Sequence, residues 1–423
     1  MKTLFTNARI LDVKNGVINL GNVEVVDGII TNVGTFDMSN DYDRTIDCKG
    51  NILMPGFVDT HCHTPMTLLR SFSDDKDLNA WLFGDILPAE AKLTPKDIYW
   101  GEYLGILESV RAGITTIEEG YFFNDAIYDA VKKSGIRARI GFGPTTRDVG
   151  MSNAEYLASE LQNIVPTDLI KPVCFVHSIY TSTEKMVQES VEFAQNKNIP
   201  LSIHLAETRK EVVDSLEKNK KTPTKYLDDL KYFDRDCLCY HSIHLTDEDI
   251  RILKEKSVSI STCPSSNVKL ASGIAPIHTY LENGINVTIG TDGTASNNSL
   301  DMFKEMFLVA TLSKVDISRA DVVSAIDVLR MATMNGAKAL GFNSGEIAVG
   351  KNADIILIDI NQPHYQPQHN LISHLVYAGK SSDVYLTMIA GKIVYENGEY
   401  NVGEDVSTIY EKANTIRNEL YTR

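Results

Sequence analysis

The stretch "PGFVDTHCHT", residues 55–64, is an apolar run that ends in two histidines flanking one cysteine. Side chains on a β-strand alternate between the two faces, so His61 and His63 share one face and Cys62 takes the other. Two neutral imidazoles make a poor core, because each carries a donor and an acceptor that need partners. They suit a borderline-soft divalent metal, although two ordinary loop histidines would give the same pattern. The rest of the chain has to decide between these interpretations.

Short strand-like runs of this kind recur along the middle of the chain, separated by longer helical patterns. The eight runs are "GFVDTHCH", "GITTIEEG", "RARIGFGP", "VCFVHSIYT", "LSIHLAET", "CLCYHSIH", "VSISTCPSS" and "INVTIGTDG". Eight strands with intervening helices predict an α/β fold with a closed parallel (β/α)8 barrel of the TIM type. We expect this catalytic barrel to occupy residues 56–344.

The two ends of the chain have a different, β-rich texture. Residues 1–50 alternate apolar positions around Asn, Asp and Gly turns, and a similar pattern returns at 353–360 and 383–400. The Asn-Gly pair in the last of these ranges is a hairpin signal. We expect residues 1–55 and 345–423 to form one small β-sandwich domain from discontinuous sequence, with an amphipathic helix over 406–423.

Composition limits the compartment and the partners. The chain has 423 residues, 43% of them hydrophobic and 23% charged, which is typical of a globular protein large enough for a barrel or several domains. A net charge of −15 and a pI near 5.2 argue against nucleic acid or an anionic membrane as partner. No 18-residue apolar span or signal-like apolar stretch is present, and the six cysteines are scattered. We therefore expect a cytoplasmic protein with reduced thiols.

Most of the polar residues that stand out lie where a predicted strand ends. They are His61, His63, His204, His241 and Asp292. In a barrel of this type the chemistry is built at the carboxyl ends of the strands. Each residue alone fits a satisfied core or loop side chain, but their shared position favours a metal site. Three imidazoles and one carboxylate would leave a coordination position open, as in a catalytic zinc site.

Several longer motifs carry a resemblance to a known family. They are "PGFVDTHCHTPMTLLR", "IHLAET", "CPSSNVKLASGIAPI", "GTDGTASNNSLDMFKEM" and "GKNADIILID". Together they resemble the amidohydrolase superfamily and, within it, the branch of 5'-methylthioadenosine/S-adenosylhomocysteine deaminases. The resemblance extends over essentially the whole chain, including both β-rich ends, and it implies a (β/α)8 barrel beside a small β-sandwich.

The same resemblance implies the activity. Members of this branch are metal-dependent hydrolases that act on the C–N bond of a cyclic amidine. The expected substrate is an adenosine-like nucleoside, namely 5'-methylthioadenosine, S-adenosylhomocysteine, 5'-deoxyadenosine or adenosine, which is converted to its inosine form and ammonia. Many relatives are homodimers or homotetramers, so we expect a homo-oligomer.

The family's metal ligands match four positions of this sequence: His61, His63, His204 and Asp292. Binuclear members place a carbamylated lysine on the fourth strand, and "VCFVHSIYT" contains no lysine. We therefore expect one metal ion per chain. Zinc is usual in this branch, but iron is used elsewhere in the superfamily, and the ligand types leave Fe²⁺ open.

The catalytic residues are also carried over from the family. Its glutamate, three residues after the fifth-strand histidine, matches Glu207, and its sixth-strand histidine matches His241. Bound zinc lowers the pKa of water from about 15.7 to about 7 and so generates a nucleophile. Attack at C6 of the purine requires protonation of N1, for which Glu207 is the expected general acid. Asp292 is expected to accept the water's proton and pass it towards the leaving ammonia, while His241 steadies the attacking oxygen.

Substrate contacts follow from the same resemblance. Trp81 is expected to line the pocket, Glu90 to accept hydrogen bonds from the ribose hydroxyls, Glu207 to meet the purine, and His177 to contact the purine or the ribose. If these residues do not bind substrate, Trp81 would be a core side chain, Glu90 a solvated residue on a helix and His177 an ordinary histidine at a strand end.

One position departs from the family's pattern. Many members carry a substrate-binding arginine near the third strand, and the aligned residue here is Phe142, although Arg147 could supply a guanidinium. Without it, a less polar 5' substituent would be preferred over the amino-acid tail of S-adenosylhomocysteine.

The alternative function is a deaminase of another aminated heterocycle of the guanine, cytosine or triazine type. Glu90 distinguishes this function from nucleoside deamination, because a free base has no ribose for Glu90 to bind. A non-catalytic scaffold would have lost ligands, whereas every ligand position is filled.

Overall fold

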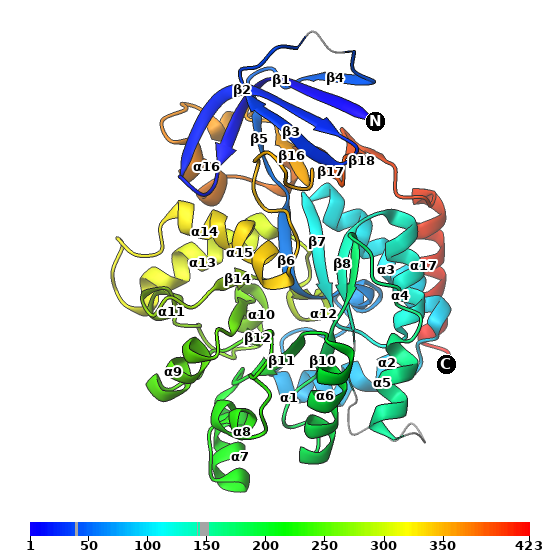
Figure 1. Ribbon diagram of the computed structural model, residues 1–423. Coiled ribbons are helices and arrows are strands. Elements are labelled where there is room, and N and C mark those ends of the chain that lie inside the picture. Colours follow the sequence, from blue (N-terminus) through cyan, green and yellow to red (C-terminus); the bar gives the residue numbers. More distant parts are fainter. Residues whose placement is uncertain (39–40, 142, 144–151) are drawn as a thin grey trace.

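The middle of the chain forms a closed barrel of parallel strands (Figure 1). The computed structural model describes residues 1–423 except 39–40, 142 and 144–151. Two five-stranded parallel sheets, in the orders β10-β11-β12-β13-β14 and β15-β6-β7-β8-β9, make up the barrel. Their strands are β6 (Phe57–His63), β7 (Ile114–Glu119), β8 (Arg137–Ile140), β9 (Ile170–Pro172), β10 (Cys174–Val176), β11 (Leu201–Leu205), β12 (Cys237–His241), β13 (Ser259–Thr262), β14 (Val287–Ile289) and β15 (Asp292–Gly293).

The two sheets join at both edges. Val173 alone separates β9 from β10, and residues 290–291 separate β14 from β15, so each pair is one interrupted strand. Reading the interrupted pairs as single strands gives eight, in the order of the sequence, and β15 pairs with β6 to close the ring. The predicted (β/α)8 barrel is confirmed.

Helices surround the barrel and follow its strands. They are α3 (Pro95–Arg111), α4 (Asn124–Ser134), α5 (Asn153–Leu161), α6 (Glu184–Lys197), α7 (Arg209–Asn219), α8 (Pro223–Asp229), α9 (Asp247–Glu255), α10 (Pro264–Lys269), α11 (Ile277–Glu282), α12 (Thr294–Asn297), α13 (Met302–Asp316), α14 (Ala325–Met331) and α15 (Met334–Leu340). Capping side chains start several of them: Thr94, Thr246 and Ser324 each accept a hydrogen bond from the third residue of their helix. Two one-turn helices, α1 (Leu78–Trp81) and α2 (Leu87–Glu90), lie between β6 and α3.

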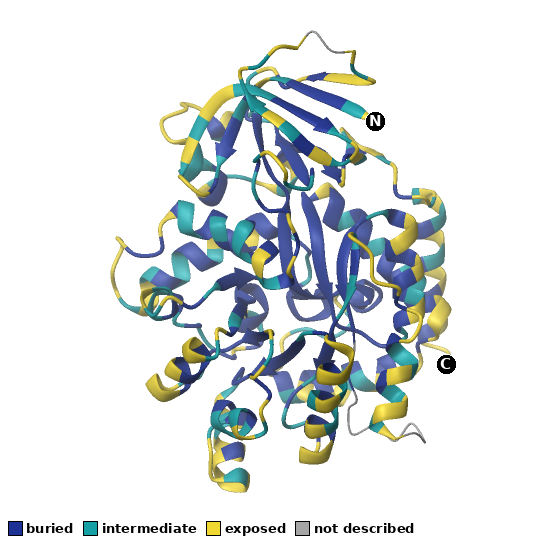
Figure 2. Ribbon diagram, in the orientation of Figure 1, coloured by how far each residue is buried: buried dark blue, intermediate teal, exposed yellow. Residues whose placement is uncertain are grey.

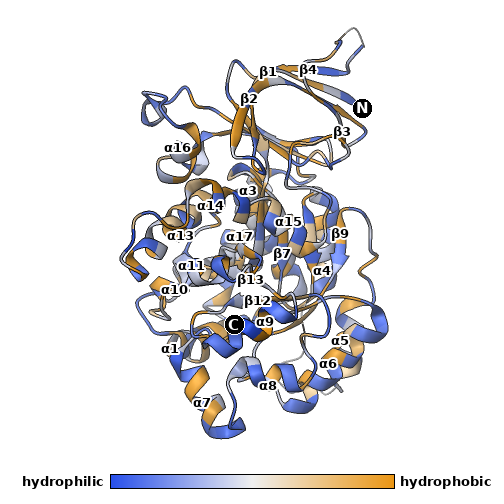
Figure 3. Ribbon diagram, turned by 60° about the vertical axis from the view of Figure 1, so that its left-hand side comes forward, coloured by the Kyte–Doolittle hydropathy of each residue, from blue (hydrophilic) through white to orange (hydrophobic). Residues whose placement is uncertain are grey.

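The two ends of the chain share one nine-stranded mixed sheet. Its strands are β1 (Lys2–Asp12), β2 (Val17–Val26), β3 (Ile29–Gly34), β4 (Arg44–Asp47), β5 (Ile52–Pro55), β16 (Ile355–Ile358), β17 (Val384–Ile389), β18 (Lys392–Glu396) and β19 (Glu399–Tyr400). The antiparallel pair β5 and β16 joins the two ends. The sheet curves round on itself (Figure 3) and encloses an apolar core that includes Phe5, Leu53 and Leu357. The small β domain predicted from the termini is confirmed, and its two layers belong to one continuous sheet.

The C-terminal segments lie on the barrel. Helix α16 (Leu371–Tyr377) packs on α13 and α14, and α17 (Val406–Leu420), the predicted closing helix, packs on α3 (Figure 1). The Tyr99 hydroxyl on α3 donates to Glu404 Oε1 at 2.7 Å, just before α17 begins. The domain boundaries at 55/56 and 344/345 stay a prediction.

The short connection between the two domains sets the direction in which the barrel strands run. Strand β5 of the terminal sheet runs into β6 through Gly56 alone, so the amino ends of the barrel strands face the small domain (Figure 1). A Cβ at Gly56 would lie 2.1 Å from Thr115 Cγ2, which explains the glycine at this crossing. The barrel strands are buried while the outer helix faces are exposed (Figure 2). Across the described part of the chain, no helix is long and apolar enough to span a bilayer.

Candidate metal centre and active site

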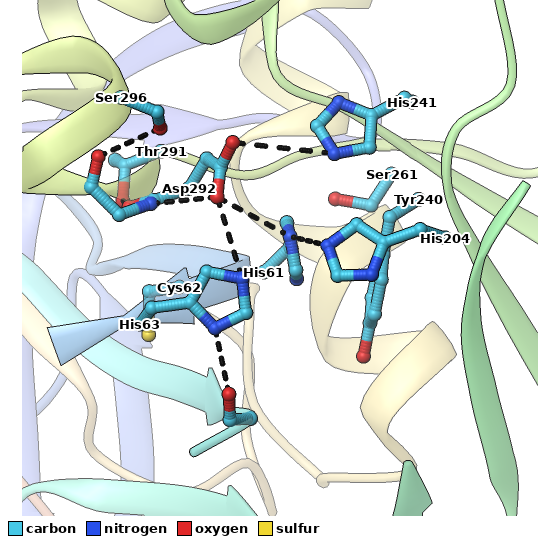
Figure 4. Close-up of polar contacts among 12 residues, drawn as sticks. His61, Cys62, His63, His204, Tyr240, His241, Ser261, Thr291, Asp292 and Ser296 are labelled. Atoms are coloured by element: carbon cyan, nitrogen blue, oxygen red, sulfur yellow. Dashed lines mark hydrogen bonds and ion pairs between the residues drawn. The ribbon is translucent and has the colours of Figure 1, made fainter. Parts of the chain in front are cut away.

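Four side chains converge at the carboxyl ends of the barrel strands (Figure 4). His61 and His63 come from β6, His204 from β11 and Asp292 from β15. Nε2 of His204 lies 3.1 Å from Nε2 of His61, and Asp292 Oδ1 lies 3.6 Å from His61 Nε2 and 3.4 Å from His63 Nε2. Ligand atoms of the three histidines lie within 4.8 Å of one another. The structure therefore brings together all four residues that the sequence predicts as metal ligands.

Hydrogen bonds fix which nitrogen of two imidazoles faces the centre. His63 Nδ1 is 2.6 Å from the Gly120 carbonyl oxygen, and His204 Nδ1 is 2.7 Å from the His177 carbonyl oxygen. A carbonyl oxygen only accepts, so each Nδ1 donates and each Nε2 presents its lone pair to the centre. Backbone partners of this kind orient metal-binding histidines in proteins.

The charge state of the imidazoles also suits a cation. Burial lowers the pKa of His61 and His204 well below 6.5, and the neighbouring imidazoles lower both further. Burial lowers the pKa of His63 as well. All three are therefore neutral at pH 7, and only a neutral imidazole has a free lone pair. The donor set of three nitrogens and one carboxylate oxygen fits zinc with one open position.

A fifth buried side chain lies at the edge of this centre. His61, His241 and Cys263 also place ligand atoms within 4.8 Å of one another. Burial raises the pKa of the Cys263 thiol well above 9.0, which favours the thiol over the thiolate that metals prefer. Cys263 is thus a weak donor beside the four proposed ligands His61, His63, His204 and Asp292.

The backbone is irregular where it delivers the ligands. The pairing of β6 with β7 shifts register between Asp59 and Cys62, and a bulge of this kind re-aims the side chains around it. His241 and Asp292 have φ values of 61° and 64°, in the left-handed region that residues with a Cβ rarely adopt. Asp59 accepts hydrogen bonds from Thr291 N at 2.9 Å and Thr291 Oγ1 at 2.5 Å, which fixes the residue before Asp292. Strain held in this way is typical of functional sites.

Glu207 and His241 form the acid–base part of the site. Nε2 of His241 lies 3.9 Å from Glu207 Oε2 and 4.0 Å from Asp292 Oδ2, and its Nδ1 lies 2.7 Å from Asn267 Oδ1. Burial raises the pKa of Glu207 and outweighs the nearby His241, which lowers this pKa; the charge of Asp292 adds to the rise. Burial lowers the pKa of His241, but the charges of Glu207 and Asp292 outweigh burial and leave this pKa raised. Each group therefore affects the other: an ionised Glu207 favours a protonated His241, and a protonated His241 lowers the pKa of Glu207.

An open cleft lies next to the buried side chain of Glu207. Its walls include Leu78 and Asn79 of α1, Thr208 and Ser272. The Ser272 hydroxyl donates to Glu207 Oε1 at 3.4 Å, so the cleft opens next to the proposed acid.

The predicted substrate contacts lie in different environments. Glu90, at the end of α2, is buried and accepts a hydrogen bond from the Tyr121 hydroxyl at 2.5 Å. His177 is half-buried, and its ring centre lies 4.8 Å from that of His204. Trp81 packs in the apolar core of the barrel domain. Arg147 lies outside the described residues, as does residue 142.

Sequence reasoning missed the residues that support the site. Asn267 holds His241, Ser272 contacts Glu207, Asp59 holds the Thr291 backbone and Tyr121 contacts Glu90. Asn267 and Ser272 fall within a quoted motif, "CPSSNVKLASGIAPI", but no periodicity distinguishes them from neighbouring polar residues. The roles of the ligands, of Glu207 and of the substrate contacts stay predictions that this geometry supports.

The whole chain is similar to known proteins. A model described as "Amidohydrolase family" matches residues 52–394. The 5-methylthioadenosine/S-adenosylhomocysteine deaminase of Thermoanaerobacter pseudethanolicus is 39% identical over 427 residues, covering 99% of this chain and 99% of the relative. The 5'-deoxyadenosine deaminase of Methanosphaera stadtmanae is 38% identical over 403 residues, covering 93% of this chain and 94% of the relative. Among solved structures, an adenosine deaminase from Xanthomonas campestris with bound zinc has a TM-score of 0.93 and 33% identity, covering 100% of this chain and 99% of that chain.

Proposed function

This chain belongs to the amidohydrolase family, and we propose that it hydrolyses the bond between C6 and the amino group of an adenosine-like nucleoside. The products are the inosine form of the nucleoside and ammonia. The candidate substrates are 5'-methylthioadenosine, S-adenosylhomocysteine, 5'-deoxyadenosine and adenosine. The convergence of three neutral imidazoles and a carboxylate, in a chain similar along its whole length to deaminases of such nucleosides, carries this proposal.

One zinc ion per chain would be held by His61, His63, His204 and Asp292. Zinc bound there supplies a Lewis acid that lowers the pKa of water to about 7, so that water can attack C6 at neutral pH. The bound zinc of the Xanthomonas campestris structure supports zinc over Fe²⁺, and metal analysis of the purified protein distinguishes them.

Glu207 is the proposed proton donor to N1 of the purine. Its buried carboxyl has a raised pKa, so it carries a proton at a pH where an exposed glutamate would not. A protonated N1 accepts the electrons that attack at C6 pushes into the ring, which lowers the barrier to addition. Ser272 is positioned to hold the Glu207 carboxyl while the proton moves.

Asp292 and His241 are proposed to act on the attacking water and the leaving amino group. The Asp292 carboxylate is the proposed acceptor of the first proton that the attacking water loses, and it would pass this proton to the leaving amino group. The second proton of the water would return to Glu207 as the C6 carbonyl forms and ammonia leaves. His241, fixed through Asn267, would donate a hydrogen bond from Nε2 to the attacking oxygen. Its raised pKa favours the protonated ring that such donation needs.

Substrate orientation would depend on residues around the mouth of the barrel. Glu90 is the proposed partner of the ribose hydroxyls, because a carboxylate accepts from two adjacent hydroxyls at once. His177 is the proposed contact to the purine or ribose, Trp81 is proposed to line the pocket, and Arg147 to meet the 5' substituent. We also propose a cytoplasmic homodimer or homotetramer; the six buried, unpaired cysteines agree with a reducing compartment.

A nucleoside panel tests the proposed function. The change in ultraviolet absorbance on deamination is followed for the four candidate nucleosides, for adenine, guanine and cytosine, and for a triazine, each at its own wavelength, and kcat/KM is compared. We expect turnover of one or more nucleosides and a large preference for adenosine over free adenine. Glu90→Gln should narrow this preference, because the amide loses one of the acceptors for the ribose diol. Turnover of a free base with no turnover of any adenosine analogue would contradict the proposal.

A further inference from the structure

His61 differs from the other two histidines of the metal centre. The Nδ1 atoms of His63 and His204 donate to backbone carbonyls, whereas Nδ1 of His61 is buried and has no hydrogen-bond partner among the described residues. Metal-binding histidines almost always have such a partner, because it fixes the ring orientation. Something else therefore has to hold the His61 ring.

The face of a phenol ring covers the His61 imidazole. The ring centres of His61 and Tyr240 lie 3.7 Å apart and the two planes differ by 20°, a stacked arrangement. The other rings near His61 lie edge-on or tilted, including Phe175 at 6.4 Å and 58°. Tyr240 is thus the side chain that restricts rotation of His61 about its side-chain bonds.

Tyr240 is itself anchored by charged groups inside the barrel. Its hydroxyl donates to Glu118 on β7, although β12 and β7 are not neighbouring strands, so the contact crosses the barrel interior. Glu118 pairs in register with Arg139 on β8, and the two side chains form an ion pair. Arg139 also donates to the Ala339 carbonyl at 3.2 Å. Burying the Glu118–Arg139 ion pair costs desolvation energy, which only close and well-aligned charged groups repay. The pair therefore fixes the position of Glu118 more strictly than apolar packing would.

We propose that Tyr240 is a positioning residue for the metal centre, and that its stacked ring holds His61 with Nε2 aimed at the ion. Glu118 and Arg139 hold Tyr240 in turn. The inference rests on the proposed metal centre, and it assigns to ring stacking the task that carbonyl oxygens perform for His63 and His204. A ligand held in place before the ion arrives loses less freedom on binding, which strengthens the site.

Substitutions separate the ring from its hydroxyl. Tyr240→Leu removes the stacked face, Tyr240→Phe keeps the face and loses the hydroxyl, and Glu118→Gln weakens the anchor. Tyr232→Leu is the matched control, because Tyr232 is another fully buried tyrosine of the barrel, whose hydroxyl donates to the Ser202 carbonyl at 2.8 Å. Both leucine variants lose a buried aromatic ring, so an effect on zinc binding that came only from that loss would appear in both.

Zinc affinity and a cobalt spectrum are the readouts. Metal-free protein is titrated with zinc against a chromogenic chelator, and the visible spectrum of the Co²⁺-substituted protein reports ligand geometry independently of activity. We expect Tyr240→Leu to bind zinc roughly 10–100-fold more weakly and to show an altered cobalt spectrum, as for loss of other residues that support a metal ligand. Tyr240→Phe keeps the stacked face but loses the hydrogen bond to Glu118, so it should lie between the unmodified protein and Tyr240→Leu. Glu118→Gln, which only weakens that hydrogen bond, should lie no further from the unmodified protein than Tyr240→Phe, and Tyr232→Leu should match the unmodified protein.

The outcomes separate this inference from the metal centre itself. His61→Ala should lose zinc; if it binds zinc normally, the ligand set is wrong. If His61→Ala loses zinc but a folded Tyr240→Leu binds it with unchanged affinity and spectrum, only the role of Tyr240 is wrong. Equal losses in Tyr240→Phe and Tyr240→Leu would also overturn it, since the hydroxyl and not the ring would then be responsible.

A second measurement needs only the conservative variant, which covers the case that Tyr240→Leu fails to fold. Zinc added to the metal-free protein should perturb the ultraviolet absorption of the stacked tyrosine, because the charge on His61 changes when its lone pair is engaged. The difference spectrum of Tyr240→Phe should lack this component. Identical difference spectra for the unmodified protein and Tyr240→Phe would overturn the inference.

Discussion

The two ends of the barrel bury polar side chains in opposite ways. At the amino end, facing the terminal sheet, Arg137 Nε lies 2.6 Å from Asp354 Oδ2 and Arg137 Nη2 lies 2.9 Å from Asp354 Oδ1. Asp354 Oδ1 also accepts from the Ala390 backbone N–H at 2.8 Å. At the carboxyl end, the Nε2 atoms of the clustered histidines face one another, and those of His61 and His204 are 3.1 Å apart with no opposing charge between them.

This difference separates a structural site from a functional one. Two hydrogen bonds join the Arg137 guanidinium to the Asp354 carboxylate, so the two charges neutralise each other. This contact holds the barrel and the terminal sheet together. The histidine cluster instead directs imidazole nitrogens to one point, an arrangement that suits a cation. Burial of polar groups alone does not mark a functional site. Buried nitrogen and oxygen atoms that converge on one point are the better indication.

The largest effect is expected at the carboxyl end, from Glu207→Gln. The amide cannot deliver a proton to N1, so kcat should fall roughly 10²–10⁴-fold. Zinc content should stay the same, because Glu207 is not among the proposed ligands. The measurements are steady-state kinetics and metal analysis on the same preparation.

The control for this substitution is Glu217→Gln, on the exposed part of α7, which should leave kcat unchanged. If Glu207→Gln retains more than about a tenth of kcat, the proton donor is another group. If it loses zinc together with activity, Glu207 belongs to the ligand set and the division of roles at the carboxyl end is wrong.

At the amino end, Arg137→Met should affect stability and leave the chemistry unchanged. Removing one partner leaves Asp354 buried without its counter-charge, which should lower the free energy of unfolding by about 3–5 kcal/mol. The double substitution Arg137→Met with Asp354→Leu should recover part of this loss, since no uncompensated charge remains. Urea unfolding measures the effect, and kcat per folded molecule should be unchanged. A fall in kcat without loss of stability would show that the two ends are coupled.

The comparison is sharpened further through pH, where the effect within any one pH unit is the smallest of the three. Glu305 on α13 is buried near the mouth and accepts a hydrogen bond from Ser265 N at 2.9 Å. Burial raises its pKa from 4.5 to about 8. Between these values the folded protein binds a proton that the unfolded chain does not, so this contribution to stability is present below pH 4.5 and is lost as pH rises towards about 8.

Glu305→Gln should remove that loss. The free energy of unfolding of the unmodified protein should fall more steeply with rising pH than that of the variant, by up to about 1.4 kcal/mol per pH unit. Urea unfolding at several pH values over this range measures both slopes. Parallel slopes would mean that Glu305 is ionised in the folded protein and has a compensating partner.

The sequence predicted the barrel and the ligands because both leave local signals. Strands such as "LSIHLAET" are short and β-branched, and a histidine at the end of an apolar run has few structural reasons to be there. Strand order alone brings together five candidates, because all parallel strands deliver their ends to one rim: His61, His63, His204, His241 and Asp292. The choice of four of them as metal ligands came from the resemblance to the amidohydrolase superfamily.

The supporting interactions could not be predicted in this way. Whether Tyr240 meets His61 or Glu118 depends on side-chain conformers and on contacts across the closed barrel, which no short stretch encodes. The partners of His63 and His204 are backbone carbonyls, which any residue type supplies. Asn267 resembles its polar neighbours until the fold places it beside His241.

Anomalous X-ray scattering at the zinc edge, from crystals of the protein grown with zinc, tests the metal centre most directly. We expect one peak per chain, about 2.0–2.2 Å from Nε2 of each of the three histidines and from one carboxylate oxygen of Asp292. Two peaks in this pocket, or a single peak away from these four side chains, would contradict a mononuclear centre at the carboxyl end of the barrel.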